Sequence, residues 1–177
     1  MKEIKNIGGI GSILGLAIVI PRLGGVFAFV GFVMVVIAIY KLSKAVGQKE
    51  IFRHYLIAII TISLAFLILG PGIGGAIFFA LEKELKALSA GVLVTALLCW
   101  ILLIVAGYFT KKSFEIISSA TGVEDFKIAG NFYFIGNILL IIAIGIIISF
   151  IGIILQTVAF FSLPSVLPTK TQKPPST

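Results

Sequence analysis

Few side chains in this sequence could do chemistry, and none stands in a recognised catalytic pattern. The only histidine, His54, lies between Arg53 and Tyr55, and the only cysteine, Cys99, precedes Trp100. His54 could serve as a pH sensor or a ligand, and Cys99 as a redox or metal group. Neither has a second ligand or a base at a suitable spacing. The favoured interpretations are therefore an interfacial histidine and a packed thiol.

Uncharged polar residues within long apolar runs are the stronger candidates for a site. They are Asn131, Asn137, Gln156 and Thr157. Amides surrounded by hydrocarbon must find hydrogen-bond partners. These residues could form a polar path or binding site, or they could bond between helices at about 0.6–2 kcal/mol per contact. The second interpretation is favoured.

Motifs for catalysis and for cofactors are missing from the sequence. It contains no CxxC, no HExxH, no phosphate-binding glycine loop and no nucleophile elbow. No Asp, Glu, Lys or Arg lies deep within an apolar run. This counts against pumps and proton-coupled carriers, which place ionisable groups there. We expect a non-enzymatic protein with no catalytic, cofactor-binding or metal residue.

Composition identifies the solvent in which this chain folds. Of the 177 residues, 59% are hydrophobic and 12% are charged, and the mean hydropathy is +1.21. A chain with so little polar surface cannot cover a globule in water, and the bilayer is the solvent that fits. The net charge is +7. Because the basic residues stand at the ends of apolar runs, we expect no nucleic-acid partner.

The apolar runs predict an all-α, polytopic membrane protein with six transmembrane helices. Their approximate ranges are 5–20, 23–42, 53–70, 88–110, 126–143 and 146–163. Two loops, 43–47 and 118–122, end in a glycine that suits a helix C-terminus. The glycine-rich segment 70–75, which contains Pro71, is expected to end the third helix. Residues 76–87 then form an interfacial helix or extend a neighbouring span.

We expect a single transmembrane domain over residues 1–163 and a disordered cytoplasmic tail over 164–177. Four of the six prolines fall in that tail. With six spans, 11 Lys and Arg residues lie on one side of the membrane and 3 on the other. The positive-inside rule then predicts a multi-pass protein of the cell membrane with both termini in the cytoplasm. The basic side is expected to favour anionic lipid.

An internal repeat organises the domain. Residues 7–42 and 128–163 align at an offset of 121 without a gap, with nine identities in 36 pairs. Four of the nine are glycine pairs: Gly9/Gly130, Gly15/Gly136, Gly24/Gly145 and Gly31/Gly152. The alignment predicts two parallel hairpins flanking a central pair of helices, residues 53–110. It also places the turn of the second hairpin at 142–145, because Pro21 aligns with Ile142.

Small residues recur at helical spacing in both copies and predict helix contacts. The candidates are Gly24, Ala28 and Gly31 in the first copy and Gly145, Ser149, Gly152 and Ala159 in the second. Gly8, Ser12 and Gly15 form a shorter stripe of the same kind. Residues three and four apart share one face of a helix. Small side chains there let two backbones approach closely within lipid.

Four blocks of sequence resemble a known membrane family. They are Gly8–Leu14, the Tyr40–Ser43 to Phe52–Arg53 loop, the Ser113–Ile117 to Phe126–Gly130 segment, and Ala159–Pro164. Together they are similar to the archaeal and bacterial domain of unknown function 996. The resemblance implies a membrane topology and carries no activity or catalytic residue with it.

Two hypotheses about function follow. The first is a non-enzymatic membrane protein that acts by association with itself, with lipid or with another membrane protein. The alternative, suggested by the internal duplication, is a small-solute transporter or channel. The sequence leaves the choice between a homo-oligomer and a different membrane-protein partner open.

Overall fold

A computed structural model describes the backbone of residues 1–81 and 85–165 and the side chains of 1–72 and 91–165. The described chain is helical throughout, as predicted. The α-helices are α1 (Lys2–Leu16), α2 (Gly24–Val46), α3 (Lys49–Leu81), α4 (Leu85–Thr121), α5 (Glu124–Ile138) and α6 (Ile144–Phe161), with short 3-10 segments η1 (Ala17–Val19) and η2 (Leu139–Ile142). From residue 166 onward the predicted tail lies outside the described residues.

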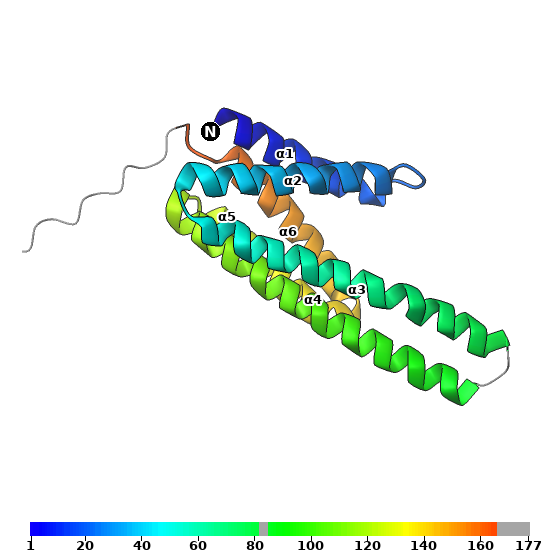
Figure 1. Ribbon diagram of the computed structural model, residues 1–177. Helices are drawn as coiled ribbons and strands as arrows, with labels where there is room; N and C mark the ends of the chain where they lie inside the picture. Colours follow the sequence, from blue (N-terminus) through cyan, green and yellow to red (C-terminus); the bar gives the residue numbers. More distant parts are fainter. Residues whose placement is uncertain (82–84, 166–177) are drawn as a thin grey trace, which may run out of the picture.

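The helices form two arms that share one end. In Figure 1, α1 and α2 make one arm, α3 and α4 make the other, and α5 and α6 lie between and behind them. The helices pack in the order α2, α1, α6, α5, α4, α3, and α2 and α3 touch much less than the other neighbours. The N-terminus, the α2–α3 connection and the α4–α5 connection all lie at the shared end (Figure 1).

The turns lie where the sequence places them. Helix α2 ends at Gly47 and α4 is followed by Gly122, and both glycines have φ of 75°. Left-handed backbone of this kind is the usual end of a helix at glycine. The second hairpin turns at Ala143, whose φ is 61°. The corresponding residue of the first hairpin, Arg22, also has a positive φ, at 69°.

The predicted break at residues 70–75 is wrong. Helix α3 continues through Pro71 and runs for 33 residues, and α4 runs for 37 residues. Their lengths are therefore about 50 Å and 55 Å at 1.5 Å per residue. Within a membrane, neighbouring helices can accommodate the carbonyl that a proline leaves unbonded, so a helix can continue where it would end in water. Residues 76–81 and 85–87 thus extend α3 and α4, and they do not form a separate interfacial helix.

Five helices are long and apolar enough to cross a bilayer, whereas α1 is shorter than expected. The five are α2, the Lys49–Gly72 part of α3, the Gly91–Thr121 part of α4, the segment Glu124–Ile142 and α6. In place of the predicted first span, 5–20, the structure has the 15-residue α1, which begins at Lys2, followed by the three residues of η1. The narrower η1 rises about 2 Å per residue, so it lengthens the rod that α1 begins.

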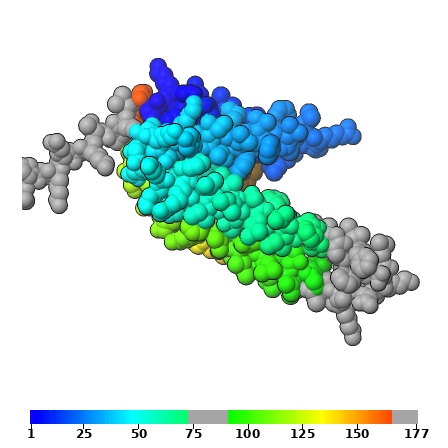
Figure 2. All heavy atoms as spheres, viewed as in Figure 1, coloured from blue at the N-terminus to red at the C-terminus, as the bar shows by residue number. Residues whose placement is uncertain are grey.

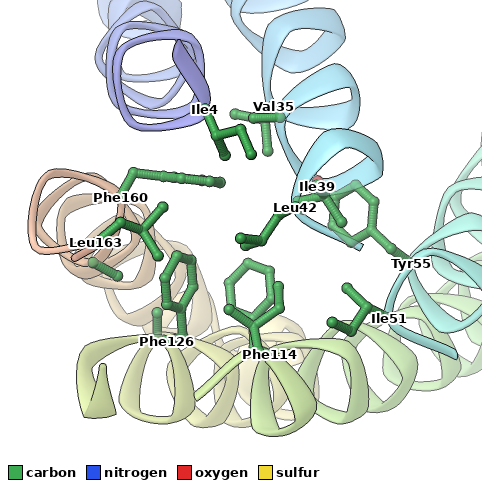
Figure 3. Close-up of a cluster of buried hydrophobic side chains, with 14 residues drawn as sticks. Ile4, Val35, Ile39, Leu42, Ile51, Tyr55, Phe114, Phe126, Phe160 and Leu163 are labelled. Carbon is green, nitrogen blue, oxygen red and sulfur yellow. The ribbon is translucent and has the colours of Figure 1, made fainter. Parts of the chain in front are cut away.

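A cluster of buried apolar side chains closes the shared end of the two arms. All six helices contribute to it, and Figure 3 shows the side chains converging from every side. Phe126 pairs with two other rings of the cluster, with ring centroids 5.6 Å from Phe114 and 5.1 Å from Phe160, both edge-to-face. Such aromatic pairs add about 0.5–1.5 kcal/mol beyond simple burial.

Close approach within each hairpin depends on a pair of glycines. A Cβ atom added to Gly31 of α2 would overlap the carbonyl oxygen of Gly11 in α1. A Cβ atom added to Gly145 of α6 would overlap the carbonyl oxygen of Gly136 in α5. Gly152, which aligns with Gly31, has more room, because its nearest neighbour would be Cβ of Phe132 at 3.4 Å.

This difference in space predicts that alanine destabilises the protein more at Gly31 than at Gly152. Gly31→Ala should destabilise the protein by about 1–3 kcal/mol, because its new methyl group meets backbone that cannot move aside. Gly152→Ala should change stability by less than about 1 kcal/mol, since helix propensity improves and the contact is ordinary. Gly152→Leu should destabilise more than Gly152→Ala. Thermal unfolding of the three variants in one detergent is the measurement. A Gly152→Leu protein as stable as the parent would show that this face meets lipid.

Candidate functional site

A cavity lies where the six helices converge, beside the apolar cluster. Its volume is about 350 Å³, within the size range of small-molecule sites. Every helix contributes to its wall. The lining residues are Gly11, Ser12, Gly15, Ala28, Gly31, Phe32, Val35, Tyr55, Ala58, Ile59, Ile62, Leu103, Thr110, Tyr133, Asn137, Ser149, Ile153 and Gln156. The wall is mostly apolar, with a few polar atoms facing inward.

Three polar side chains from three helices form a hydrogen-bonded chain at this cavity. The Tyr133 hydroxyl of α5 donates to Oε1 of Gln156 at 2.9 Å. Nε2 of Gln156, on α6, donates to the Ser12 hydroxyl of α1 at 2.7 Å. The Ser12 hydroxyl in turn donates to the carbonyl oxygen of Gly8 at 2.8 Å. The chain therefore joins the first hairpin to the second.

A second polar contact joins α5 to α4 on the cavity wall. Nδ2 of Asn137 donates to the carbonyl oxygen of Leu103 at 2.7 Å. The indole of Trp100 donates to the backbone carbonyls of Asn137 and Ile138 at 3.1 and 3.2 Å. These carbonyls lie at the end of α5, where no later turn of the α-helix supplies a donor. The pairing thus satisfies backbone groups that hydrocarbon would leave exposed.

The structure brings five of the predicted site residues to the cavity. They are Ala28, Gly31, Asn137, Ser149 and Gln156. The others lie outside its lining: Gly24, Gly145, Gly152, Ala159, Asn131 and Thr157. The Thr157 hydroxyl donates to the Ile153 carbonyl of its own helix at 2.9 Å. Two residues of the polar chain were missed as site candidates. Ser12 was visible as a member of a small-residue stripe, and Tyr133 carried no signal beyond its alignment with Ser12 at the repeat offset.

His54 and Cys99 lie apart from the cavity. Nδ1 of His54 lies 2.9 Å from the Glu50 carbonyl oxygen, and its ring stacks on Phe109 with centroids 5.9 Å apart. The thiol of Cys99 is buried and lies 3.4 Å from the carbonyl oxygen of Ala65 in α3. Cys99 also borders a wider apolar hollow of about 1030 Å³ between α3, α4 and η2. Among the residues described here, no three His, Cys, Asp or Glu side chains are grouped as metal ligands would be.

Basic side chains gather toward the shared end of the arms. Nine of the ten Lys and Arg residues whose side chains are described lie in the helix segments toward that end, and the tenth, Arg22, lies at the turn between α1 and α2: Lys2, Lys5, Lys41, Lys44, Lys49, Arg53, Lys111, Lys112 and Lys127. Several are paired. Lys41 bonds Glu3, and this hydrogen bond, together with the charge of Lys41, lowers the pKa of the Glu3 carboxyl. Lys112 lies 3.2 Å from Glu115, to which Lys111 also approaches within 3.8 Å.

Comparison with known proteins identifies relatives without assigning an activity. The model of a family described as a protein of unknown function, DUF996, matches residues 27–154. An uncharacterised protein of Methanocaldococcus jannaschii, MJ1644, is 41% identical to this chain over 168 residues, which is 93% of each protein. No solved structure matches the chain. The resemblance found in the four sequence blocks is confirmed.

The polar chain predicts an unequal effect of two neighbouring substitutions. Gln156→Leu leaves the hydroxyls of buried Ser12 and partly buried Tyr133 without their shared partner, so it should destabilise the protein by about 1–3 kcal/mol. Thr157→Val removes a hydroxyl that bonds only its own helix, and should change stability by less than about 0.5 kcal/mol. Thermal unfolding in detergent measures both. Equal losses, or no loss in Gln156→Leu, would show that the polar chain does not hold the hairpins together.

Proposed function

We propose that this chain, which belongs to the DUF996 family, is a non-enzymatic binding protein of the cell membrane. In this proposal it crosses the bilayer with six spans, keeps both termini in the cytoplasm, and acts by holding a ligand between its helices. The observation that carries the proposal is the cavity of about 350 Å³ to which all six helices contribute. Sites between the helices of a bundle are a common place for small ligands.

The chemistry of the wall favours binding over catalysis. The polar side chains of the lining are hydroxyls and amides, and their bonding is directed at one another and at backbone carbonyls. General acid–base catalysis needs a group that exchanges a proton near neutral pH, and nucleophilic catalysis needs an activated nucleophile. Hydroxyls and amides of this kind serve instead to orient a ligand.

The internal repeat is part of the proposal, and the two turns support it. Arg22 and Ala143, which align at the offset of 121, both adopt positive φ after a 3-10 segment. The first hairpin contains the α1 residue Ser12, and the aligned residue of the second is Tyr133, so both copies place a hydroxyl on the same polar chain. We infer that the cavity lies between two hairpins of common origin.

The orientation rests on where the basic residues gather. Nine of the ten Lys and Arg residues whose side chains are described lie in helix segments toward the shared end, and cytoplasmic segments carry such an excess. Each basic side chain near an anionic lipid surface is worth about 1 kcal/mol, so this end is expected to favour anionic headgroups. A second copy of the chain and another membrane protein remain alternative partners in the bilayer.

Carriage of a small solute is the second candidate function. It is favoured by the position of the cavity between two related hairpins, where many carriers hold their substrate. A carrier would produce substrate-dependent flux in proteoliposomes that is lost in Gln156→Leu or Asn137→Leu. A binding protein would take up the ligand without net flux.

The proposed orientation predicts which end a membrane-impermeant thiol reagent reaches. In a Cys99→Ala background, a single cysteine replaces either Leu23, which is 59% exposed at the first hairpin turn, or Ala45, which is exposed near the end of α2. In intact cells Leu23→Cys should be labelled, and Ala45→Cys should be labelled only after permeabilisation. The reverse pattern would contradict cytoplasmic termini.

Ligand binding itself is tested by filling the cavity. Ala28 lines the wall on α2 and is partly exposed, so Ala28→Phe should occupy the space without rebuilding the core. In a thermal-shift screen of lipids and small solutes, a true ligand at about 100 times its Kd stabilises the parent protein by about 2.7 kcal/mol. The same ligand should leave Ala28→Phe unchanged. If no compound distinguishes the two proteins, the cavity is not a binding site.

A further inference from the structure

We propose that the ligand of the central cavity is an uncharged lipid with a small hydroxyl- or carbonyl-bearing head, which enters from the bilayer between α2 and α3. This inference rests on the proposed function, in which the cavity binds a ligand. It adds the chemical class of that ligand and its route of entry.

The absence of charge in the wall excludes a charged head. None of the 18 lining residues is Asp, Glu, Lys, Arg or His. Moving an ion from water into such a wall is far costlier than moving a hydroxyl or a carbonyl, unless a counter-charge meets it there. The basic side chains that could meet an anion stand toward the shared end of the arms, and none of them lines the cavity.

The polar chain leaves hydrogen-bonding capacity that suits one small head. Gln156 uses one of its two amide N–H groups on Ser12, so a second donor remains. The Tyr133 oxygen donates its hydrogen to Gln156 and keeps lone pairs that can accept. A hydroxyl head can use both, and a carbonyl head can accept from the amide. Around these few polar atoms the wall is apolar, which fits the body of a lipid.

The contact between α2 and α3 is the weakest in the helix ring, and this seam between the two helices is the proposed route of entry from the bilayer. Helices α2 and α3 make less contact with each other than any other neighbouring pair in the ring. Figure 2 shows the notch that this leaves between the two arms. Phe32 on α2 and Ile59 and Ile62 on α3 line the cavity from the two sides of the seam. Apolar side chains at a seam within hydrocarbon admit a lipid chain without desolvating any charge.

The test compares two photoreactive amphiphiles that differ only in the head. A diazirine-bearing hexadecanol and its sulfate ester are each presented to the full-length protein in nanodiscs of neutral phospholipid. Labelled peptides are then identified by mass spectrometry. The alcohol should label lining residues at about ten times the level of the sulfate, because an unpaired charge is far costlier to bury than a hydroxyl.

Three variants show whether the label reports the cavity. Tyr133→Phe keeps the ring and removes the hydroxyl, so labelling by the alcohol should fall about three- to tenfold, the effect of one hydrogen bond. Ala28→Phe should abolish the label in the cavity. Thr157→Val, on the same helix as Gln156 but outside the lining, should label like the parent protein. The melting temperature of each variant in nanodiscs shows whether it folds. If Ala28→Phe does not fold, the labelling of Tyr133→Phe is the deciding result.

The contrary outcomes separate the two proposals. Equal labelling by the alcohol and the sulfate, or labels outside the lining residues, would overturn the neutral-lipid inference. If neither amphiphile labels the cavity while a water-soluble solute stabilises the parent protein over Ala28→Phe, the inference fails and the binding function stands. If no compound of any class distinguishes the parent from Ala28→Phe, both fail.

Discussion

The hydrogen-bonded chain through Ser12, Gln156 and Tyr133 is the interaction on which the rest of the structure depends. Hydrocarbon offers no hydrophobic drive for helices to associate, so close packing and polar contacts must hold them together. Gln156 bonds α1 on one side and α5 on the other, although Ser12 is 144 residues away in sequence. That contact brings the two terminal hairpins into one ring. It adds a polar contact to the apolar cluster through which all six helices already meet.

The two ends of the molecule follow from different kinds of packing. At the shared end, aromatic and aliphatic side chains from all six helices fill the space, as Figure 3 shows. Farther along, glycines such as Gly31 bring α1 and α2 together, and the arms separate. A cavity remains where the dense cluster gives way to the diverging arms. The hydrogen-bonded polar chain on its wall joins α1, α5 and α6, and the weakest helix contact in the ring lies between α2 and α3.

Local signals in the sequence predicted the helices and most of their ends. Contacts between residues distant in the sequence could not be predicted from it. Gly47 and Gly122 end helices as expected, because left-handed backbone there depends on the glycine itself. The turn at Ala143 was predicted only through the alignment of residues 142–145 with 21–24, since the second copy has no proline there. The helix end predicted at Pro71 was wrong, because the effect of a proline on a helix depends on neighbouring helices that the sequence does not show. Gln156 and Asn137 stood out as amides in apolar runs, whereas the role of Tyr133 appears only when α5 and α6 are brought together.

The central claim is that this cavity holds a ligand within the membrane, and native mass spectrometry of protein extracted from its own membranes tests it most directly. The parent protein should retain one neutral lipid per chain through mild delipidation, and its Ala28→Phe variant, extracted in the same way, should carry none. Retention of the same lipid by both proteins would place it elsewhere on the surface. A parent protein with no bound mass would contradict the account.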